Sequence, residues 1–213
     1  MDDPSLQGDF LGLYYSCAHS LCPEAMLSGS STVRDAVMPE RGDVEGAGKN
    51  LDPLAVKHLV VIDGQARIRC WRALARQPYW ENVVVLHSRK VGREYLSGLD
   101  ELGILHFYAG DDRVDLAAGL DILGDEMGLS AIRVDSGGTL NGALLRQGLV
   151  DEVSLLVSPS LVGGTSPKGF FTASDVSGPD QVVKLSLRKV ETLAGGVLWL
   201  RYDAPQPASG PRL

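Results

Sequence analysis

The sequence predicts an α/β fold: a three-layer sandwich with a mostly parallel central sheet and an antiparallel hairpin near the C-terminus. Two observations lead to this fold class. Short, continuous apolar runs rich in β-branched residues alternate with helical patterns over residues 59–147, as in strands buried on both faces of a parallel sheet. The last third of the chain instead carries strand patterns separated by hairpin residues.

The runs that predict buried strands each end in polar or small residues. They are Leu59–Asp63 (LVVID), Val83–His87 (VVVLH), Ile104–Tyr108 (ILHFY) and Ala131–Asp135 (AIRVD). Apolar residues at helical spacing predict helices over Leu116–Met127 and Leu140–Gln147, and Gly148 ends the second helix.

The strands expected in the last third are Val153–Ser158, Val182–Val190 and Val197–Tyr202. Ala194-Gly195-Gly196 predicts a hairpin between the last two, so we expect an antiparallel pair that closes an otherwise parallel sheet. No repeat or composition break divides the chain, and residues 1–203 are expected to form a single domain. Residues 41–50 are expected to be a flexible loop and residues 204–213 a flexible tail.

Charge and composition exclude several classes of function. The chain has 213 residues and a net charge of −7, with no Lys/Arg run, which disfavours nucleic-acid binding. No apolar run approaches the roughly 20 residues that span a bilayer, so no membrane association is expected. The N-terminus lacks a signal-peptide pattern, and three cysteines form no disulfide framework. These features predict a cytoplasmic protein.

A metal site is not predicted. Cys17, His19 and Cys22 could supply three ligands, but no fourth partner or second CxxC pair appears. Residues 11–21 can equally form a helix that places Leu13, Cys17 and Leu21 on one face, and this reading is favoured.

Two glycine turns could carry chemistry. Residues 135–139 (DSGGT) lead from a strand into a helix, where adjacent glycines allow a ligand to approach the main chain and the helix N-terminus offers unpaired N–H groups to an anion. Residues 26–35 (MLSGSSTVRD) likewise lead from a short strand through a glycine into a helical turn. The hydroxyl groups in this segment can bond a phosphate oxygen. The alternatives are a tight turn without ligand and simple helix capping.

The run 134–164 (VDSGGTLNGALLRQGLVDEVSLLVSPSLVGG) resembles the signature of the C-terminal reductase domain of the bifunctional riboflavin biosynthesis deaminase-reductase, and of the stand-alone 2,5-diamino-6-ribosylamino-pyrimidinone phosphate reductases. Residues 29–35 (GSSTVRD), 60–64 (VVIDG) and 185–202 resemble further family segments, so the likeness covers Glu24–Asp203. The resemblance implies a dihydrofolate-reductase-like fold, NADPH as cofactor, a small pyrimidine or pterin substrate and a homodimer. The implied reaction converts a ribosylaminopyrimidinone phosphate to its ribitylamino form.

The resemblance also implies roles for single residues. Gly29, Ser31 and Thr32 would contact the NADPH diphosphate, Gly64 would lie near the cofactor, and Asp135 would orient the substrate or relay a proton. The second cofactor-binding turn would comprise Gly137, Gly138, Thr139, Leu140 and Asn141. Position and charge suggest that Ser88 and Arg89 approach the 2′-phosphate; the alternative is a solvated strand end.

Three departures from the family pattern bear on the substrate. The family opens with a strand carrying Ser-Leu-Asp-Gly, to which only residues 5–8 (SLQG) are similar. Ala36 stands at a position that is acidic in the family, and residues 39–52 do not align. Alternatives are therefore a dihydrofolate-reductase-like or orphan pyrimidine/pterin reductase, or a non-catalytic NADPH-binding dimeric protein.

Overall fold

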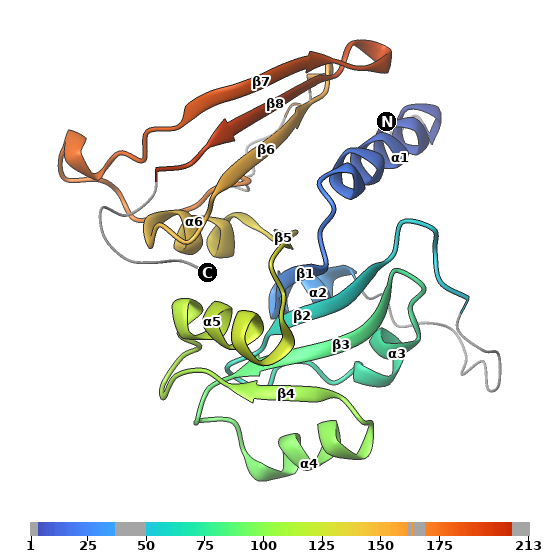
Figure 1. The fold of residues 1–213 in the computed structure, drawn as a ribbon, viewed down its shortest axis with the longest axis vertical. Coiled ribbons are helices and arrows are strands. Elements are labelled where there is room, and N and C mark those ends of the chain that lie inside the picture. The colour runs from blue at the N-terminus through green and yellow to red at the C-terminus, as the bar shows by residue number, and fades with distance from the viewer. Residues whose placement is uncertain (1–3, 37–49, 162, 164–168, 206–213) are drawn as a thin grey trace. The chain divides into compact units, whose positions relative to one another are not determined.

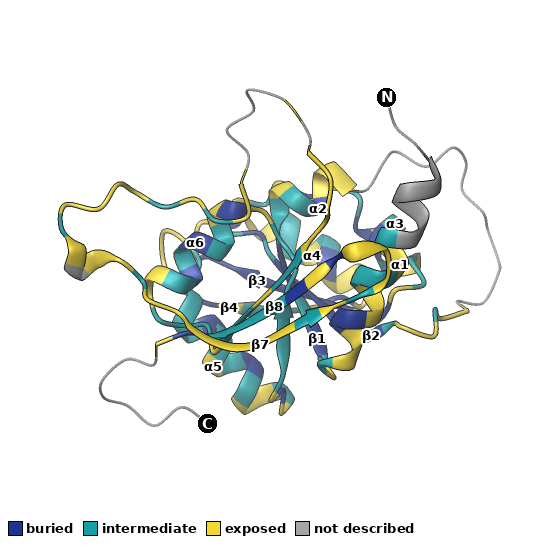
Figure 2. Cartoon of the chain, turned by 90° about the horizontal axis from the view of Figure 1, so that it is seen from above, coloured by how far each residue is buried: buried dark blue, intermediate teal, exposed yellow. Residues whose placement is uncertain are grey.

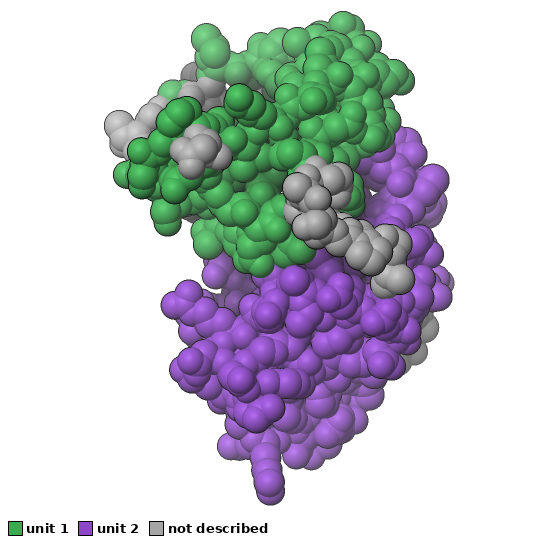
Figure 3. Space-filling model, turned by 60° about the vertical axis from the view of Figure 1, so that its left-hand side comes forward, with its two compact units in different colours: residues 1–15, 138–212 green, residues 16–137, 213 purple. Residues whose placement is uncertain are grey.

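The computed structural model describes residues 4–36, 50–161, 163 and 169–205. The chain divides into two compact units: residues 16–137, with Leu213, form one, and residues 1–15 and 138–212 form the other (Figure 3). The predicted loop at 41–50 lies outside the described residues except for Asn50, and so does the predicted tail beyond Pro205.

The unit of residues 16–137 contains a five-stranded parallel sheet in the order β4-β3-β2-β1-β5 (Figure 1). The strands are β1 Ala25–Gly29, β2 Val56–Ile62, β3 Trp80–His87, β4 Leu105–Tyr108 and β5 Ile132–Val134. The helices that lie wholly within the described residues of this unit are α2 Ser30–Ala36, α3 Trp71–Arg76, α4 Arg93–Glu101 and α5 Leu116–Met127. Helix α1, Pro4–Ser20, is divided between the two units.

Both faces of this sheet are covered, which explains why its central strands read as continuous apolar runs. Alternate residues of β2 and β3 pack with α2, α3 and α4 into one core cluster that includes Trp71 and Leu99. The opposite face receives α5, where a Cβ added to Gly119 would lie 3.0 Å from Leu86 Cδ1. Val60 and Val61 are fully buried as a result. Figure 2 accordingly draws strand β3 largely in the colour of buried residues. Helices on both faces make three layers, as predicted.

The four predicted parallel strands are confirmed, with different ends. β2 begins at Val56 and β3 at Trp80, because these two residues are partners in the parallel ladder although polar residues follow each of them. β5 is confined to Ile132–Val134. The predicted helix at Leu116–Met127 is confirmed with identical bounds: Asp115 caps its first turn, and Gly128 ends it with a left-handed φ of 66°.

The second unit contains a three-stranded antiparallel sheet in the order β6-β8-β7. Its elements are α6 Gly138–Arg146, β6 Glu152–Val157, the short 3₁₀ helix η1 Pro179–Gln181, β7 Ser186–Thr192, the turn η2 Ala194–Gly196 and β8 Leu198–Asp203. The hairpin predicted at Ala194–Gly196 is confirmed; Gly195 and Gly196 both adopt positive φ, which the tight turn requires.

One expectation about this hairpin is wrong. The antiparallel pair does not close the parallel sheet, because β8 is paired on both sides, with β7 and with β6, in a separate sheet. The predicted strand at 182–190 begins later, at Ser186, because residues 179–181 form a 3₁₀ turn.

Ion pairs link all three strands of the antiparallel sheet. The Glu152 carboxylate of β6 receives two hydrogen bonds from Arg201 of β8, at 2.6 and 2.7 Å, and one from Arg188 of β7 at 2.5 Å. Arg188 also pairs with Asp203. The side chains of Glu152 and Arg201 are only 19% and 21% exposed, so this bidentate pair is a structural tie between strands.

We expect Glu152→Gln to lower the free energy of unfolding by about 1–3 kcal/mol, because it removes the shared acceptor of two guanidinium groups. Urea unfolding monitored by circular dichroism measures the change. Glu191→Gln is the matched control: Glu191 forms an ion pair with Lys189 in the same sheet, and its loss should change the value by about 0.5 kcal/mol or less. Equal effects of the two substitutions would contradict the structural role of Glu152.

Candidate functional site

The predicted site residues of the first unit gather at one edge of its sheet. Gly29 is the last residue of β1, and Ser31 and Thr32 follow it in α2. Gly64 follows β2, Ser88 and Arg89 follow β3, and Asp135 and Gly137 follow β5. Because the strands are parallel, their carboxyl ends lie along the same edge (Figure 1). The crevice outside the carboxyl ends of such strands is the usual ligand position in open α/β sheets.

Hydroxyl groups join the turns after β1 and β5. The Gly29 N–H donates to Ser136 Oγ at 3.1 Å, and the Gly137 N–H donates to Thr32 Oγ1 at 3.1 Å. The two hydroxyls of Thr32 and Ser136 lie 3.1 Å apart. The structure thus brings Gly137 next to Gly29 and Thr32, although it lies more than 100 residues from both in sequence. Ser31, next to them, is exposed.

Sequence reasoning missed Ser136, whose hydroxyl contacts both Gly29 and Thr32. The only signal available was a hydroxyl residue directly before the two glycines, at the end of a predicted strand.

Asp135 is held firmly at the end of β5. Its N–H donates to Leu27 O at 3.0 Å, and its carbonyl accepts from Ser28 Oγ at 2.9 Å. The carboxylate lies 3.7 Å from the Arg133 guanidinium, and the side chain is 31% exposed. This arrangement fixes the main chain at Asp135 and leaves its carboxylate partly accessible beside the glycine turn, where it can form a hydrogen bond to a small ligand.

The Gly64 turn is fixed from two sides. The fully buried Ser88 donates its hydroxyl to Gly64 O at 2.7 Å. The Asp63 carboxylate, also fully buried, accepts from the N–H groups of Arg67 and Ile68 at 2.8 and 2.9 Å and from the Tyr95 hydroxyl at 2.6 Å. Burial, and then the hydrogen bond to Asp63, raises the pKa of Tyr95, which keeps its phenol protonated as a donor.

Ser88 and Arg89 therefore differ sharply in accessibility. The Ser88 hydroxyl faces the protein interior, where it positions Gly64. The Arg89 side chain is 73% exposed; its Nε lies 3.1 Å from Asp111 Oδ1 and its guanidinium stands 5.0 Å from the centre of the Tyr108 ring. Of the two residues, Arg89 is the one whose side chain an anion in solution can reach.

Three side chains in contact with one another, His87, His106 and Asp100, connect this edge of the sheet with the surface of α4. His87 Nδ1 lies 3.1 Å from Ser88 O, and since a carbonyl only accepts, Nδ1 carries the proton. His87 Nε2 lies 3.2 Å from His106 Nδ1, and His106 Nε2 lies 3.2 Å from Asp100 Oδ1. Burial lowers the pKa of His87; the hydrogen bond to Ser88 opposes this, and His106 adds to it.

In the other unit, Gly138 and Asn141 of α6 contact residues 169–172. Thr172 N donates to Gly138 O at 2.9 Å, and Asn141 Nδ2 donates to Phe170 O at 2.8 Å. A Cβ on Gly138 would lie 2.4 Å from Gly169 O, so close packing by itself requires glycine there. Thr139 is exposed and Leu140 is half-buried. Whether these residues line a cofactor turn stays a prediction.

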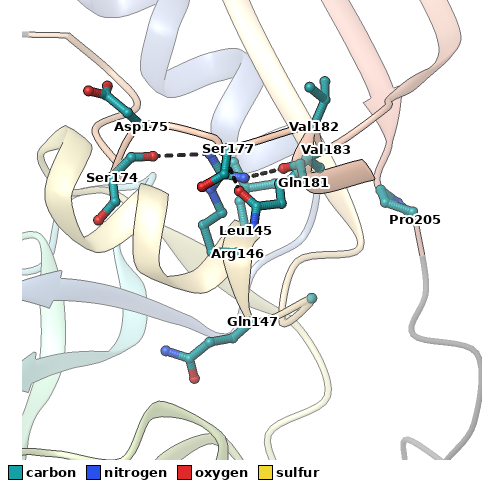
Figure 4. Close-up of a pocket in the computed structure, with 11 residues that line it drawn as sticks. Leu145, Arg146, Gln147, Ser174, Asp175, Ser177, Gln181, Val182, Val183 and Pro205 are labelled. Atoms are coloured by element: carbon teal, nitrogen blue, oxygen red, sulfur yellow. Dashed lines mark hydrogen bonds between the residues drawn. The ribbon is translucent and has the colours of Figure 1, made fainter. Parts of the chain in front are cut away.

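A pocket of about 780 Å³ lies beside the C-terminal end of α6 in the same unit (Figure 4). Arg146 occupies its wall and donates to the carbonyl groups of Gln181 and Ser174. The Ser177 N–H donates to the Gln181 side chain at 2.7 Å. Because Arg146 already bonds two main-chain carbonyls, its contacts hold residues 174–181 against the helix.

The described residues contain neither a cluster of metal ligands nor a membrane-spanning helix. No three His, Cys, Asp or Glu side chains in those ranges are grouped as a metal ion would require. Within the same ranges, no helix has both the length and the apolar character that crossing a bilayer demands.

Comparison with known proteins identifies a family. The family described as the RibD C-terminal domain matches residues 22–199. The riboflavin biosynthesis protein RibD of Actinobacillus pleuropneumoniae is 34% identical over 90 residues, which are 42% of this chain and 24% of that protein. The 2,5-diamino-6-ribosylamino-4(3H)-pyrimidinone 5′-phosphate reductase of Archaeoglobus fulgidus is 27% identical over 165 residues, 78% of this chain and 68% of that protein.

A solved structure confirms the fold class. Acinetobacter baumannii RibD superposes with a TM-score of 0.63 at 21% identity, over 88% of this chain and 49% of that one. The match with the first of the curated relatives spans about a quarter of that relative's length. The family match over residues 22–199 confirms the family inferred from residues 134–164.

Adjacent glycines should respond differently to a methyl group. Gly138→Ala should lower the free energy of unfolding by about 1–3 kcal/mol, because the new Cβ meets the main chain of residues 169–171. Gly137→Ala should change it by less than about 0.5 kcal/mol, because only Thr32 Oγ1, at 3.8 Å, lies near its Cβ. Urea unfolding of both variants measures the two changes. A larger loss of stability in Gly137→Ala than in Gly138→Ala would contradict this prediction.

His87 should make stability depend on pH. Its folded-state pKa lies below the value of about 6.5 in the unfolded chain, so the unfolded state binds more protons as the pH falls below about 6.5. Stability should therefore be full above about pH 7 and fall at lower pH. His87→Asn, which keeps an N–H near Nδ1, should flatten this slope in urea unfolding measured across the range. His58, whose pKa burial also lowers, acts in the same direction, so some slope should remain.

Proposed function

Because the chain belongs to the RibD C-terminal domain family, we propose that it is an NADPH-dependent reductase that converts a ribosylaminopyrimidinone phosphate to the ribitylamino form in riboflavin biosynthesis. The observation that carries the proposal is the joined pair of turns at Gly29–Thr32 and Asp135–Gly137, on the edge where a ligand meets the sheet. The name of the Archaeoglobus fulgidus relative supports the substrate class.

The residues of this edge suit a dinucleotide. Gly137 is exposed, and nothing but Thr32 Oγ1 lies within 4 Å of the position where its Cβ would be, so a ligand can approach the main chain. Gly29, Ser31, Thr32 and Gly137 would hold the diphosphate, Gly64 would lie alongside, and Arg89 would face the 2′-phosphate. Ser88 would act by fixing Gly64.

In this proposal NADPH, when bound, supplies the hydride that reduces C1 of the substrate's ribose. The protein chain positions the cofactor and the substrate relative to each other. Asp135, with its main chain bonded to Leu27 and Ser28, orients the substrate through its carboxylate or passes the proton that accompanies the hydride. Arg133 lies 3.7 Å from that carboxylate and forms an ion pair with it. Ser136 and Thr32 keep the two turns at a constant separation, so that cofactor and substrate contacts are set before either binds.

We further propose that residues 1–203 act as a single reductase domain with a flexible tail at 204–213, working in the cytoplasm as a homodimer. The antiparallel sheet supports self-association, since one side of it leaves several apolar side chains exposed: Val157, Leu187, Val190 and Leu198. A face of this kind, free of charged side chains at these positions, suits a second copy of itself.

A second candidate function is NADPH binding without catalysis. The observation that favours it concerns residues 5–8 (SLQG), which lie within helix α1. These residues therefore do not form the substrate-contacting strand that carries Ser-Leu-Asp-Gly in the family. An orphan pyrimidine or pterin reductase would differ from the first proposal only in its substrate.

The proposal predicts selective binding of NADPH over NADH, measured by thermal shift and nicotinamide fluorescence. Gly137→Val should weaken NADPH binding roughly tenfold or more, since the side chain would stand where the ligand approaches. Gly98→Val is the control, because Gly98 lies in α4 with no atom near its Cβ. Asp135→Asn should keep NADPH affinity and lower turnover of the ribosylaminopyrimidinone phosphate roughly 100-fold or more.

Each outcome separates the candidates. Absence of binding by both coenzymes would refute the reductase proposal. Binding of NADPH without consumption of the pyrimidine would favour the non-catalytic candidate, and consumption of a pterin instead would favour the orphan reductase.

A further inference from the structure

Two cations that follow β3 are paired with two carboxylates that follow β4. Arg89 Nε lies 3.1 Å from Asp111 Oδ1, and Lys90 Nζ lies 3.0 Å from Asp112 Oδ1. All four side chains are between 65% and 81% exposed. The pairs stand at the carboxyl edge of the sheet, one strand beyond the Gly64 turn.

The carboxylates are held by a rigid loop. The Arg89 N–H donates to Gly110 O at 3.0 Å, and the Tyr108 hydroxyl donates to Asp111 Oδ1 at 2.7 Å. Gly110 has a φ of 100°, and a Cβ there would lie 2.4 Å from Arg113 O, so the loop accepts only glycine. The loop ends at Asp115, whose carboxylate caps α5. The loop main chain therefore positions Asp111 beside Arg89.

This arrangement acts on any anion that approaches Arg89 and Lys90. A phosphate must break or share two ion pairs and must come close to two carboxylates, each of which repels it. A ribose 2′-hydroxyl has no charge to repel and can donate a hydrogen bond to a carboxylate, as acidic residues do in NAD sites. The same four side chains therefore favour the hydroxyl and penalise the phosphate relative to a site with the cations alone.

We infer that Asp111 and Asp112 determine the coenzyme specificity of this reductase by competing with the 2′-phosphate of NADPH for Arg89 and Lys90. The inference rests on the proposed function, and it adds the two residues that limit the preference for NADPH over NADH. Arg89 and Lys90 raise the affinity for NADPH relative to NADH, and the two carboxylates reduce this difference. Because all four side chains are largely exposed and each ion pair has one short N–O contact, Arg89 and Lys90 can exchange the carboxylates for the phosphate when it arrives.

The experiment measures dissociation constants of NADPH and NADH by fluorescence titration at one ionic strength. Asp111→Asn should tighten NADPH binding roughly two- to fivefold, and the double variant with Asp112→Asn roughly tenfold, with NADH unchanged or weakened. Arg89→Ala should move the NADPH/NADH ratio the other way. Asp125→Asn, an exposed carboxylate on α5 with the same charge change, is the matched control and should leave the ratio unchanged.

Adenosine 2′,5′-bisphosphate and 5′-AMP serve as probes that differ only in the 2′-phosphate, and the double variant should tighten the first alone. Equal NADPH/NADH ratios in the wild type and the double variant would overturn the inference while leaving the reductase proposal intact. Failure of the wild type to bind both coenzymes would instead refute the proposed function, and the inference with it.

Discussion

The parallel pairing of β2 with β1 and β3 is the constraint on which the rest of this structure depends. Leu59, Val60 and Val61 are almost completely buried, because helices cover both faces of the sheet. Strands in one direction must end at one edge, so the turns after β1, β2, β3 and β5 meet there although they are distant in sequence. The apolar core thereby decides where ligand chemistry can occur.

The turns are made rigid by polar side chains that bond the protein itself. Asp63 and Ser88, both fully buried, hold the Gly64 turn, while Thr32 and Ser136 join the turns after β1 and β5. A buried carboxylate or hydroxyl without partners would destabilise the fold, so each hydrogen bond is necessary locally. Their combined effect is a row of main-chain groups fixed before any ligand binds, which lowers the entropy lost on binding.

The sequence could predict the parallel strands and the site edge because apolar runs and the DSGGT turn are local signals. It could not show whether a glycine is needed to let a ligand approach or to avoid a clash with the protein's own main chain. Gly137 has open space at its Cβ, whereas Gly138 is pressed by the main chain of residues 169–171, and both look alike in a Gly-Gly pair. It also could not show that the Ser88 hydroxyl turns inward or that Ser136 contacts Gly29, since these contacts join distant segments. The separate antiparallel sheet was missed for the same reason, because strand pairing is not a local property.

Two arginine–carboxylate pairs in this chain differ in burial, and this difference suits one pair to a structural role and the other to ligand binding. Arg201 grips Glu152 with two short bonds, and both side chains are about one-fifth exposed, so separating them would leave charges poorly solvated. Arg89 meets Asp111 through one contact with both side chains about three-quarters exposed, so water replaces either partner readily. The first pair can only hold strands together. The second can change partners at low cost, and it stands at the edge where the parallel strands end, which is where exchangeable charge can select a ligand.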